Sequence, residues 1–235
     1  MATIAASKWG VVTYEGDTSW NDTHGASTGT NVYNNTTSSD YASVYIDYET
    51  GSKGSTWVLR RFFIAFDASS YASGYTISNL KLYYYPTTST TNNFKIAIVK
   101  STAQGNANSN LTTADYDSFD DSVTYATNDG TDIWADSTSL SYFDLNATAI
   151  SAFTNSYVKL CILEYTHDYL DNAPSFATYW HGNGNFNGMA SGGIPYLSFT
   201  ATATGYENDV IGVSSSNIDS VNAIARADID QIIGV

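Results

Sequence analysis

Short runs in which apolar and polar residues alternate fill most of the chain between positions 57 and 199. In residues 80–85, Leu80, Leu82 and Tyr84 take every second position, which is typical of a strand with one buried face. In residues 157–165 both sets of alternate positions are apolar, which indicates a central strand covered on both faces. The pattern predicts strands over residues 57–66, 80–85, 94–100, 157–165, 176–181 and 194–200.

Clusters of Ser, Thr, Asn and Gly separate these runs, as turns do in sandwiches and barrels. Two short helices are predicted: residues 111–119, where Thr112 and Asp115 have the spacing of a capping box, and residues 146–153. Residues 17–50 predict one or two strands with long loops. The expected fold is all-β, an antiparallel jelly-roll-type β-sandwich with one or two short helices and a small C-terminal repeat segment.

The end of the chain repeats with a period of 11 residues: 210–220 align with 221–231, and 232–235 begin a third copy. A glycine at 212 or 234 would interrupt a helix at a cost of about 1 kcal/mol. We therefore expect an extended Val-x-Gly-Val piece followed by one helical turn in each copy. The first, fourth and ninth places are apolar and, with Ile211, give the predicted anchor residues Val210, Ile211, Val213, Ile218, Val221, Ile224, Ile229, Ile232 and Val235.

So few repeats cannot close a core by themselves and must pack on something else. We therefore divide the chain into a β-sandwich domain, residues 1–204, and a C-terminal repeat tail, residues 205–235, used for oligomerisation or anchoring.

Charge and cysteine content narrow the classes of partner. Nine Lys and Arg against 23 Asp and Glu give a net charge of −14, which disfavours nucleic acid and anionic membranes as partners. The single cysteine, Cys161, excludes an intramolecular disulfide. The first residues carry neither the basic stretch nor the apolar stretch of a signal peptide, so we do not expect export by that route.

Residues 61–83 resemble a family of β-sandwich modules called DNRLRE domains, which look like carbohydrate-binding modules. The shared pieces are an Arg leading a strand that ends in Phe-Asp, a Ser/Gly loop, and a Thr-Ile-Ser start of the next strand ending Leu-x-Leu-Tyr, at positions 61–67, 68–74, 76–78 and 80–83. Residues 111–116 and 143–146 are similar as well, and the resemblance covers roughly residues 40–203. It implies the same sandwich that the periodicity predicts.

Two contacts in this segment follow from physical chemistry alone. Arg61 enters a core strand and needs a carboxylate partner, and Asp67 can accept a bond from the backbone of the Ser69 turn. The tail, in turn, is similar to Val-x-Gly-Val repeats at the ends of structural proteins of tailed bacterial viruses. It departs from them at residues 222–224, where that pattern usually has a glycine.

The sequence contains no motif that indicates catalysis. His-Glu-x-x-His, phosphate-binding and dinucleotide-binding patterns are all missing, so we expect no enzyme, no catalytic residue and no cofactor. His24, His167 and His181 are too scattered to suggest a metal site. A weak calcium candidate is the acidic group Asp115, Asp117, Asp120 and Asp121, for which helix capping and solubility are equally good explanations.

Glycan binding needs flat aromatic faces beside groups that bond to hydroxyls. The candidates are Trp20, Tyr33, Trp134, Tyr179 and Trp180. The alternatives are burial in the sandwich core and use in protein interfaces, of which assembly contact is favoured.

These observations lead to one main hypothesis and one alternative. The first is a virion structural protein of a tailed bacteriophage, a fibre, spike or capsid decoration assembled in the host cytoplasm. It would be attached through its tail to itself as a homo-oligomer, with a trimer favoured, and to other virion proteins. The alternative is a secreted carbohydrate-binding module or a bacterial surface or matrix protein, and host-surface glycans are candidate ligands in either case.

Overall fold

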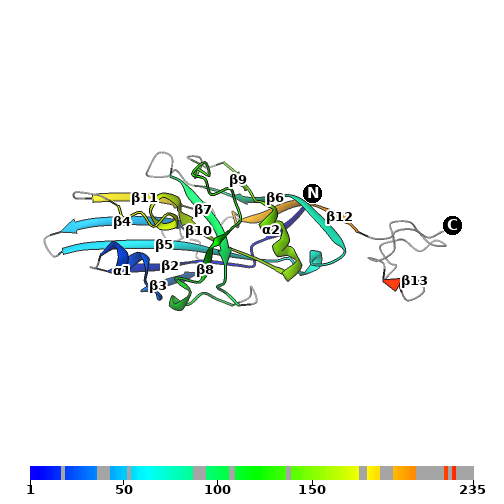
Figure 1. Cartoon of the computed structure of the whole chain (residues 1–235), viewed down its shortest axis with the longest axis horizontal. Coiled ribbons are helices and arrows are strands. Elements are labelled where there is room, and N and C mark those ends of the chain that lie inside the picture. The colour runs from blue at the N-terminus through cyan, green and yellow to red at the C-terminus, as the bar shows by residue number, and fades with distance from the viewer. Residues whose placement is uncertain are drawn as a thin grey trace.

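The computed structural model is a β-sandwich built from two antiparallel sheets (Figure 1). It describes residues 1–16, 19–35, 43–51, 54–86, 94–105, 109–135, 139–174, 179–185, 193–204, 220–221 and 224–225. The expected fold class, an antiparallel all-β sandwich with few short helices, is confirmed.

The smaller sheet has four strands in the order β1-β12-β6-β9. Their bounds are β1 (Ala2–Ala5), β12 (Tyr196–Ala203), β6 (Tyr75–Tyr84) and β9 (Ser141–Asp144). We call it the small sheet. The helix α2 (Ala147–Ser151) contacts strand β6 and the turn η3 (Ala152–Asn155). The turn η3 also contacts the turn η1 (Ser69–Tyr71).

The large sheet runs in the order β11-β4-β5-β10-β7-β8, with β2 and β3 added on the free side of β5. Its strands are β2 (Lys8–Gly16), β3 (Asn31–Asn34), β4 (Ser43–Gly51), β5 (Gly54–Asp67), β7 (Ile96–Ser101), β8 (Phe119–Thr124), β10 (Tyr157–Glu164) and β11 (Tyr179–Asn185). A separate pair, β13 (Ser220–Val221) and β14 (Ile224–Ala225), belongs to neither sheet.

Strand β5 organises the large sheet because it is long enough to serve two sets of neighbours. On one side it pairs with β2 along residues 57–65. On the other side β4 pairs with it up to Arg60, and β10 pairs with it from Phe62 onwards. The sheet therefore forks at Arg61, with β4 and β11 on one branch and β10, β7 and β8 on the other.

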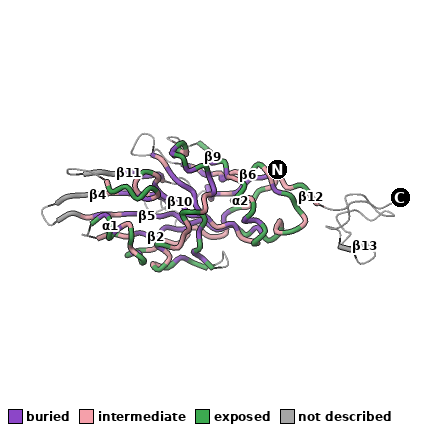
Figure 2. The backbone as a smooth tube through the Cα atoms, viewed as in Figure 1, coloured by how far each residue is buried: buried purple, intermediate pink, exposed green. Residues whose placement is uncertain are grey.

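The two faces of the large sheet pack in separate cores. Phe62, Ile64 and Phe66 belong to the core shared with the small sheet. Phe63 and Leu59 point to the opposite face, where the second core is covered by α1 (Trp20–His24), the turn η2 (Thr113–Asp115) and the π-helical turn η4 (Tyr165–Tyr169). Figure 2 shows the buried residues running along the central strands.

Several local predictions are confirmed. All six predicted strand segments overlap strands β5, β6, β7, β10, β11 and β12. Leu80, Leu82 and Tyr84 are buried on one face of β6, and β10 is buried on both faces between β5 and β7. Thr112 and Asp115 form the expected reciprocal cap, and Asn146 caps α2.

Other elements were not predicted. Strands β1, β2, β8 and β9 were missed, and residues 17–50 contain α1 as well as strands. The helix signal was Ser19 followed by Asp22, which form a capping box, but α1 has only five residues and gives almost no periodicity. In the tail, the described residues Val221 and Ile224 are extended, as expected, and pair with one another in a hairpin that was not expected.

Because β10 lies between β5 and β7 in the large sheet, shortening an apolar side chain of β10 should lower the free energy of unfolding strongly. Leu160 is fully buried, so Leu160→Ala should lower the free energy of unfolding by about 2–5 kcal/mol. The same substitution at Leu140, which is 40% exposed, should change it by no more than about 0.5 kcal/mol. Denaturant unfolding measures both, and equal effects would contradict the assigned core.

Candidate functional site

Arg61 is a fully buried arginine at the fork of the large sheet. Its guanidinium carbon lies 4.3 Å from the ring centroid of Tyr116 and 4.7 Å from that of Phe119. Such cation–π contacts are strongest when the cation is removed from water, as it is here. The positive charge therefore sits between two aromatic rings in the second core.

The guanidinium also connects three segments of the chain. It donates to both carboxylate oxygens of Asp168 in η4, with Nη2 to Oδ1 at 2.8 Å. Nη1 donates to the carbonyl of Tyr116 at 3.2 Å, and Nη2 donates to the carbonyl of His24 in α1 at 3.0 Å. The carboxylate partner expected for Arg61 is thus confirmed as Asp168. We call this group the arginine clamp: Arg61, Asp168, Tyr116, Phe119 and the His24 carbonyl.

A second buried carboxylate holds η4 in place under the clamp. Glu164 accepts bonds from the backbone amides of Thr166, His167 and Asp168. Desolvation raises the pKa of Glu164 even though the amide bonds oppose the shift. Burial lowers the pKa of Arg61, but the charges of Asp168 and Tyr116 and the hydrogen bonds to Asp168 together outweigh it, and the pKa ends above its ordinary value. The clamp is therefore charged and fully hydrogen-bonded, as a structural ion pair is.

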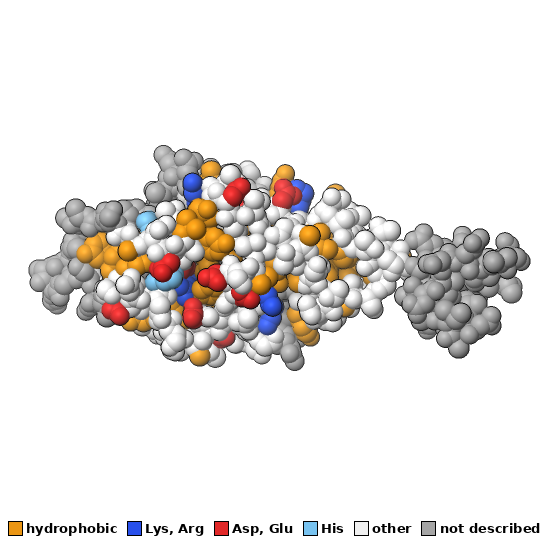
Figure 3. All heavy atoms as spheres, viewed as in Figure 1, with side chains coloured by type: hydrophobic (Ala, Val, Ile, Leu, Met, Phe, Trp, Pro, Cys, Tyr) orange, Lys and Arg blue, Asp and Glu red, His pale blue; other side chains and the backbone are white. Residues whose placement is uncertain are grey.

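A cavity of about 380 Å³ opens beside the clamp. Four carboxylates line it, together with His24 and Tyr169 among others: Asp117, Asp121, Asp168 and Asp171. His24 contacts the backbone oxygen of Asp168 through Nε2 at 2.8 Å and Asp171 Oδ1 through Nδ1 at 3.1 Å. In the space-filling view of Figure 3, acidic side chains are distributed over the middle of the visible face.

The calcium candidates near this cavity are used for other contacts. Asp115 caps η2, Asp117 lies 3.4 Å from Arg61, and Asp120 accepts from both the amide and the hydroxyl of Ser122. Within the described part of the chain, no group of three or more His, Cys, Asp or Glu side chains is arranged to hold a metal ion, and Asp121 belongs to no such group.

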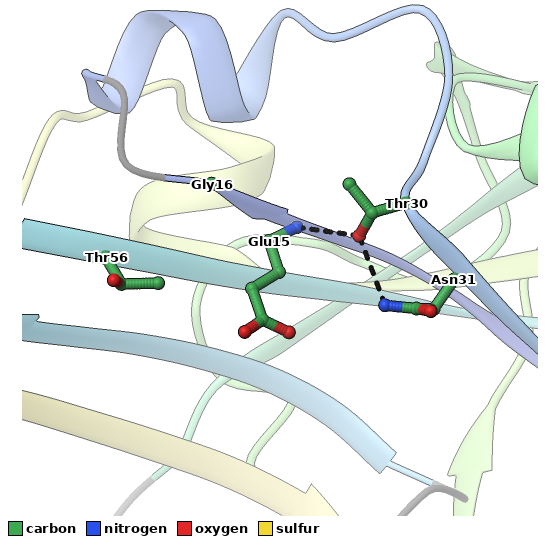
Figure 4. A pocket seen from close by; sticks show the side chains of 5 residues that line it. All are labelled: Glu15, Gly16, Thr30, Asn31 and Thr56. Carbon is green, nitrogen blue, oxygen red and sulfur yellow. Dashed lines mark hydrogen bonds between the residues drawn. The ribbon is translucent and has the colours of Figure 1, made fainter.

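A different, polar cavity lies on the same face of the large sheet as the shared core, towards the ends of β2 and β5. Val11 and Phe62 are buried on that face in the shared core, but further along the same strands Glu15 and Thr56 line an open depression of about 450 Å³. Gly16, Thr30 and Asn31 complete its wall (Figure 4). We call this depression the polar cavity.

Hydroxyl, amide and carboxylate groups dominate the polar cavity. The amide of Glu15 and the side chain of Asn31 both donate to the hydroxyl of Thr30, at 3.0 and 3.3 Å. The Glu15 carboxylate is exposed on the strand beside Thr56 (Figure 4). This donor and acceptor set suits a neutral, hydroxyl-rich ligand better than an apolar one.

An aromatic and charged group continues the same sheet face from the polar cavity. The register pairs Tyr45 of β4 with Arg60 of β5, and the Arg60 guanidinium lies 4.4 Å from the Tyr45 ring centroid. The Tyr45 hydroxyl donates to Asp47 at 3.0 Å. Sequence reasoning did not find these residues, and the only signal for them was that polar side chains occupy one face of β2 and β5 at their outer ends.

The structure places the predicted glycan-binding residues in different environments. Trp20 and Trp134 are wrong as binding faces, because they are 5% and 1% exposed and lie in the two cores. Trp20 packs on Trp57 and Trp134 on Tyr84, and a Cβ at Gly184 would lie 2.6 Å from the Trp134 ring. Both rings therefore contribute apolar area to the cores.

The other three candidates lie in strands of the large sheet. Tyr33 is half-buried on β3, two residues from Asn31 of the polar cavity. Tyr179 and Trp180 lie in β11, opposite Glu49 and Tyr48, and their side chains lie outside the described residues. Of the predicted anchor residues, the backbones of Val221 and Ile224 are described, and the following lie outside the described residues: Val210, Ile211, Val213, Ile218, Ile229, Ile232 and Val235.

Comparison with known proteins finds no family model that matches the chain and no similar curated protein. Among the helices that the structure describes, none is both long and apolar enough to cross a membrane. The resemblance to DNRLRE domains therefore stays a prediction from sequence.

The buried ion pair predicts an asymmetric mutational response. Arg61→Met should lower the free energy of unfolding by about 3–5 kcal/mol, because Asp168 then remains buried without a partner. Arg61→Met combined with Asp168→Leu should cost less than Arg61→Met alone. Asp117→Asn removes a carboxylate that contacts the same arginine but is 56% exposed, so it should cost less than about 1 kcal/mol. An equal loss of unfolding free energy for Asp117→Asn and Arg61→Met would contradict the structural role of the arginine clamp.

Proposed function

We propose that the chain is a non-enzymatic structural protein of a tailed bacteriophage virion, a fibre, spike or capsid decoration. It displays the β-sandwich of residues 1–204 and is held by the tail of residues 205–235. Its partners are further copies of itself, with a trimer favoured, and other virion proteins, and assembly takes place in the host cytoplasm.

The observation that carries the proposal is the hairpin in the tail. Val221 and Ile224, two of the apolar repeat positions, pair directly with one another in β13 and β14. A two-stranded hairpin is marginally stable in water at best. Because this hairpin belongs to neither sheet of the sandwich, a further surface is needed to stabilise it, and a neighbouring molecule supplies one.

The sandwich supports the same interpretation. Among the described residues, both sheets and both cores are built from positions up to 204. Arg61 and Asp168 form the only buried ion pair among the described residues, and Arg61 also binds the carbonyls of Tyr116 and His24, so the pair has a structural role. Such a body suits display more than chemistry.

Charging the tail should disrupt the assembly that depends on the tail while leaving the sandwich folded. Val221→Asp with Ile224→Asp in the full chain adds two charges at apolar repeat positions, which would oppose burial against a partner. The matched control, Ser214→Asp with Asn222→Asp, adds the same charge at polar positions of the repeat. Sedimentation equilibrium should report smaller assemblies for the first variant alone. An unchanged mass, or a loss of the sandwich's circular dichroism signal, would count against an anchoring tail.

Glycan binding is a second candidate function, favoured by the polar cavity and by Tyr45 and Arg60 beside it. The cavity offers hydroxyl, amide and carboxylate groups on an open sheet face, where a saccharide chain can approach. This candidate and the first are compatible, because host-surface glycans are targets of displayed virion proteins.

The glycan candidate has its own test. Glycan-array binding should weaken about tenfold in Asn31→Ala, because a ligand hydrogen bond and the support of Thr30 are lost. Asn21→Ala, at an exposed position of α1, should bind like the parent chain. The absence of any bound glycan for the parent would remove this candidate.

A further inference from the structure

The outer face of the small sheet differs in charge from the rest of the molecule. Its four strands contain only two charged residues, Lys81 and Asp144, in a chain with 23 acidic and nine basic residues. These two face each other across β6 and β9, with the Lys81 ammonium 2.6 Å from the Asp144 carboxylate. The face is therefore electrically neutral.

A row of tyrosines crosses this face beside the ion pair. The register aligns Tyr196 of β12, Tyr83 of β6 and Tyr142 of β9. The rings of Tyr83 and Tyr196 are parallel, with centroids 5.0 Å apart, and Tyr142 lies 5.3 Å from Tyr83 on the other side. We call these five residues, Lys81, Tyr83, Tyr142, Asp144 and Tyr196, the tyrosine face.

The arrangement of the rings selects the kind of ligand. Both faces of Tyr83 are occupied by its neighbours, and the Lys81 ammonium lies 3.6 Å from the Tyr142 ring centroid. A sugar stacks on open ring faces, and here those of Tyr83 are covered. Tyr142 nevertheless remains 49% exposed, so ring edges are available for protein contact. Tyrosine is enriched in protein interfaces, and its few rotatable bonds make its ordering inexpensive.

We propose that the tyrosine face binds the same face of a second copy of this chain about a twofold axis. Two chains of net charge −14 repel each other in general, and the neutral face is a surface where that repulsion is smallest. A twofold contact is self-complementary, and with the axis passing between Lys81 and Asp144, Lys81 of one copy comes opposite Asp144 of the other. This contact adds to the proposed function, since it joins sandwiches and does not involve the tail.

Charge reversal separates contact between copies from the ion pair within one copy. The full chain carrying Val221→Asp and Ile224→Asp serves as the parent, so that tail contacts do not contribute. Lys81→Glu and Asp144→Lys, each made alone, place like charges opposite each other in the twofold contact. Each should weaken self-association at least about tenfold in sedimentation equilibrium.

An equimolar mixture of the two variants is the decisive sample. In the mixed dimer each reversed charge faces its opposite, so association should return to within about threefold of the parent's. Native mass spectrometry with one chain tagged should detect the mixed species in excess of either homodimer. The control pair, Lys8→Glu and Asp121→Lys, makes the same charge changes on the large sheet and should leave association unchanged, alone or mixed.

Three results would overturn the tyrosine face as an interface. The parent could be monomeric at every concentration, the single variants could associate as tightly as the parent, or the mixture could associate no better than the single variants. Tyr142→Ser gives an independent check, because it removes an exposed ring and should also weaken association about tenfold without loss of fold. A negative result for the tyrosine face does not affect the test of the tail. The tail test compares wild-type and charged tails, and the tyrosine face is intact in both.

Discussion

The ion pair between Arg61 and Asp168 is the interaction on which the arrangement of the large sheet depends. Strand β5 exchanges one neighbour for another at Arg61, so the backbone there lacks a continuous partner strand on that side. The guanidinium holds three chain segments over the second core through bonds to Asp168, Tyr116 and His24. A buried pair of this kind adds little net stability over an apolar replacement. We interpret it as a device that specifies which segments cover the sheet.

The fork also determines where a ligand can approach. On one branch the large sheet is covered on both faces, by the small sheet and by the second core. Towards the start of β5, α1 contacts β5 and β2, and the polar cavity lies beside Glu15 of β2 and Thr56 of β5. Polar side chains such as Glu15 and Thr56 are tolerated there because they remain accessible to water.

Charge is distributed unevenly between the two sheets. Carboxylates gather around the clamp, where Asp117, Asp121 and Asp171 border the acidic cavity. The small sheet carries a single ion pair and a row of tyrosines instead. An acidic protein that assembles with itself needs such a neutral surface, since the repulsion between copies falls with the charge that they bring together. In the proposed assembly, the tail and the tyrosine face act in different contacts, one made by the tail and one between sandwiches.

Short-range features could be predicted from the sequence. The alternation of Leu80 and Leu82, the reciprocal cap of Thr112 with Asp115, and the bond from the Ser69 amide to Asp67 all involve residues within a few positions of each other. Periodicity and capping chemistry depend only on such neighbours. Even the need of Arg61 for a carboxylate was evident, because a buried guanidinium without one is too costly.

The tertiary structure decided which distant residues meet. It paired Arg61 with Asp168, 107 positions away, buried Trp20 and Trp134 instead of presenting them, and aligned three tyrosines from three strands. Composition cannot distinguish an exposed aromatic from a core one, because both lie among polar neighbours in sequence. The difference arises from strand register and from the covering layer, and both are set by contacts between residues far apart in the chain.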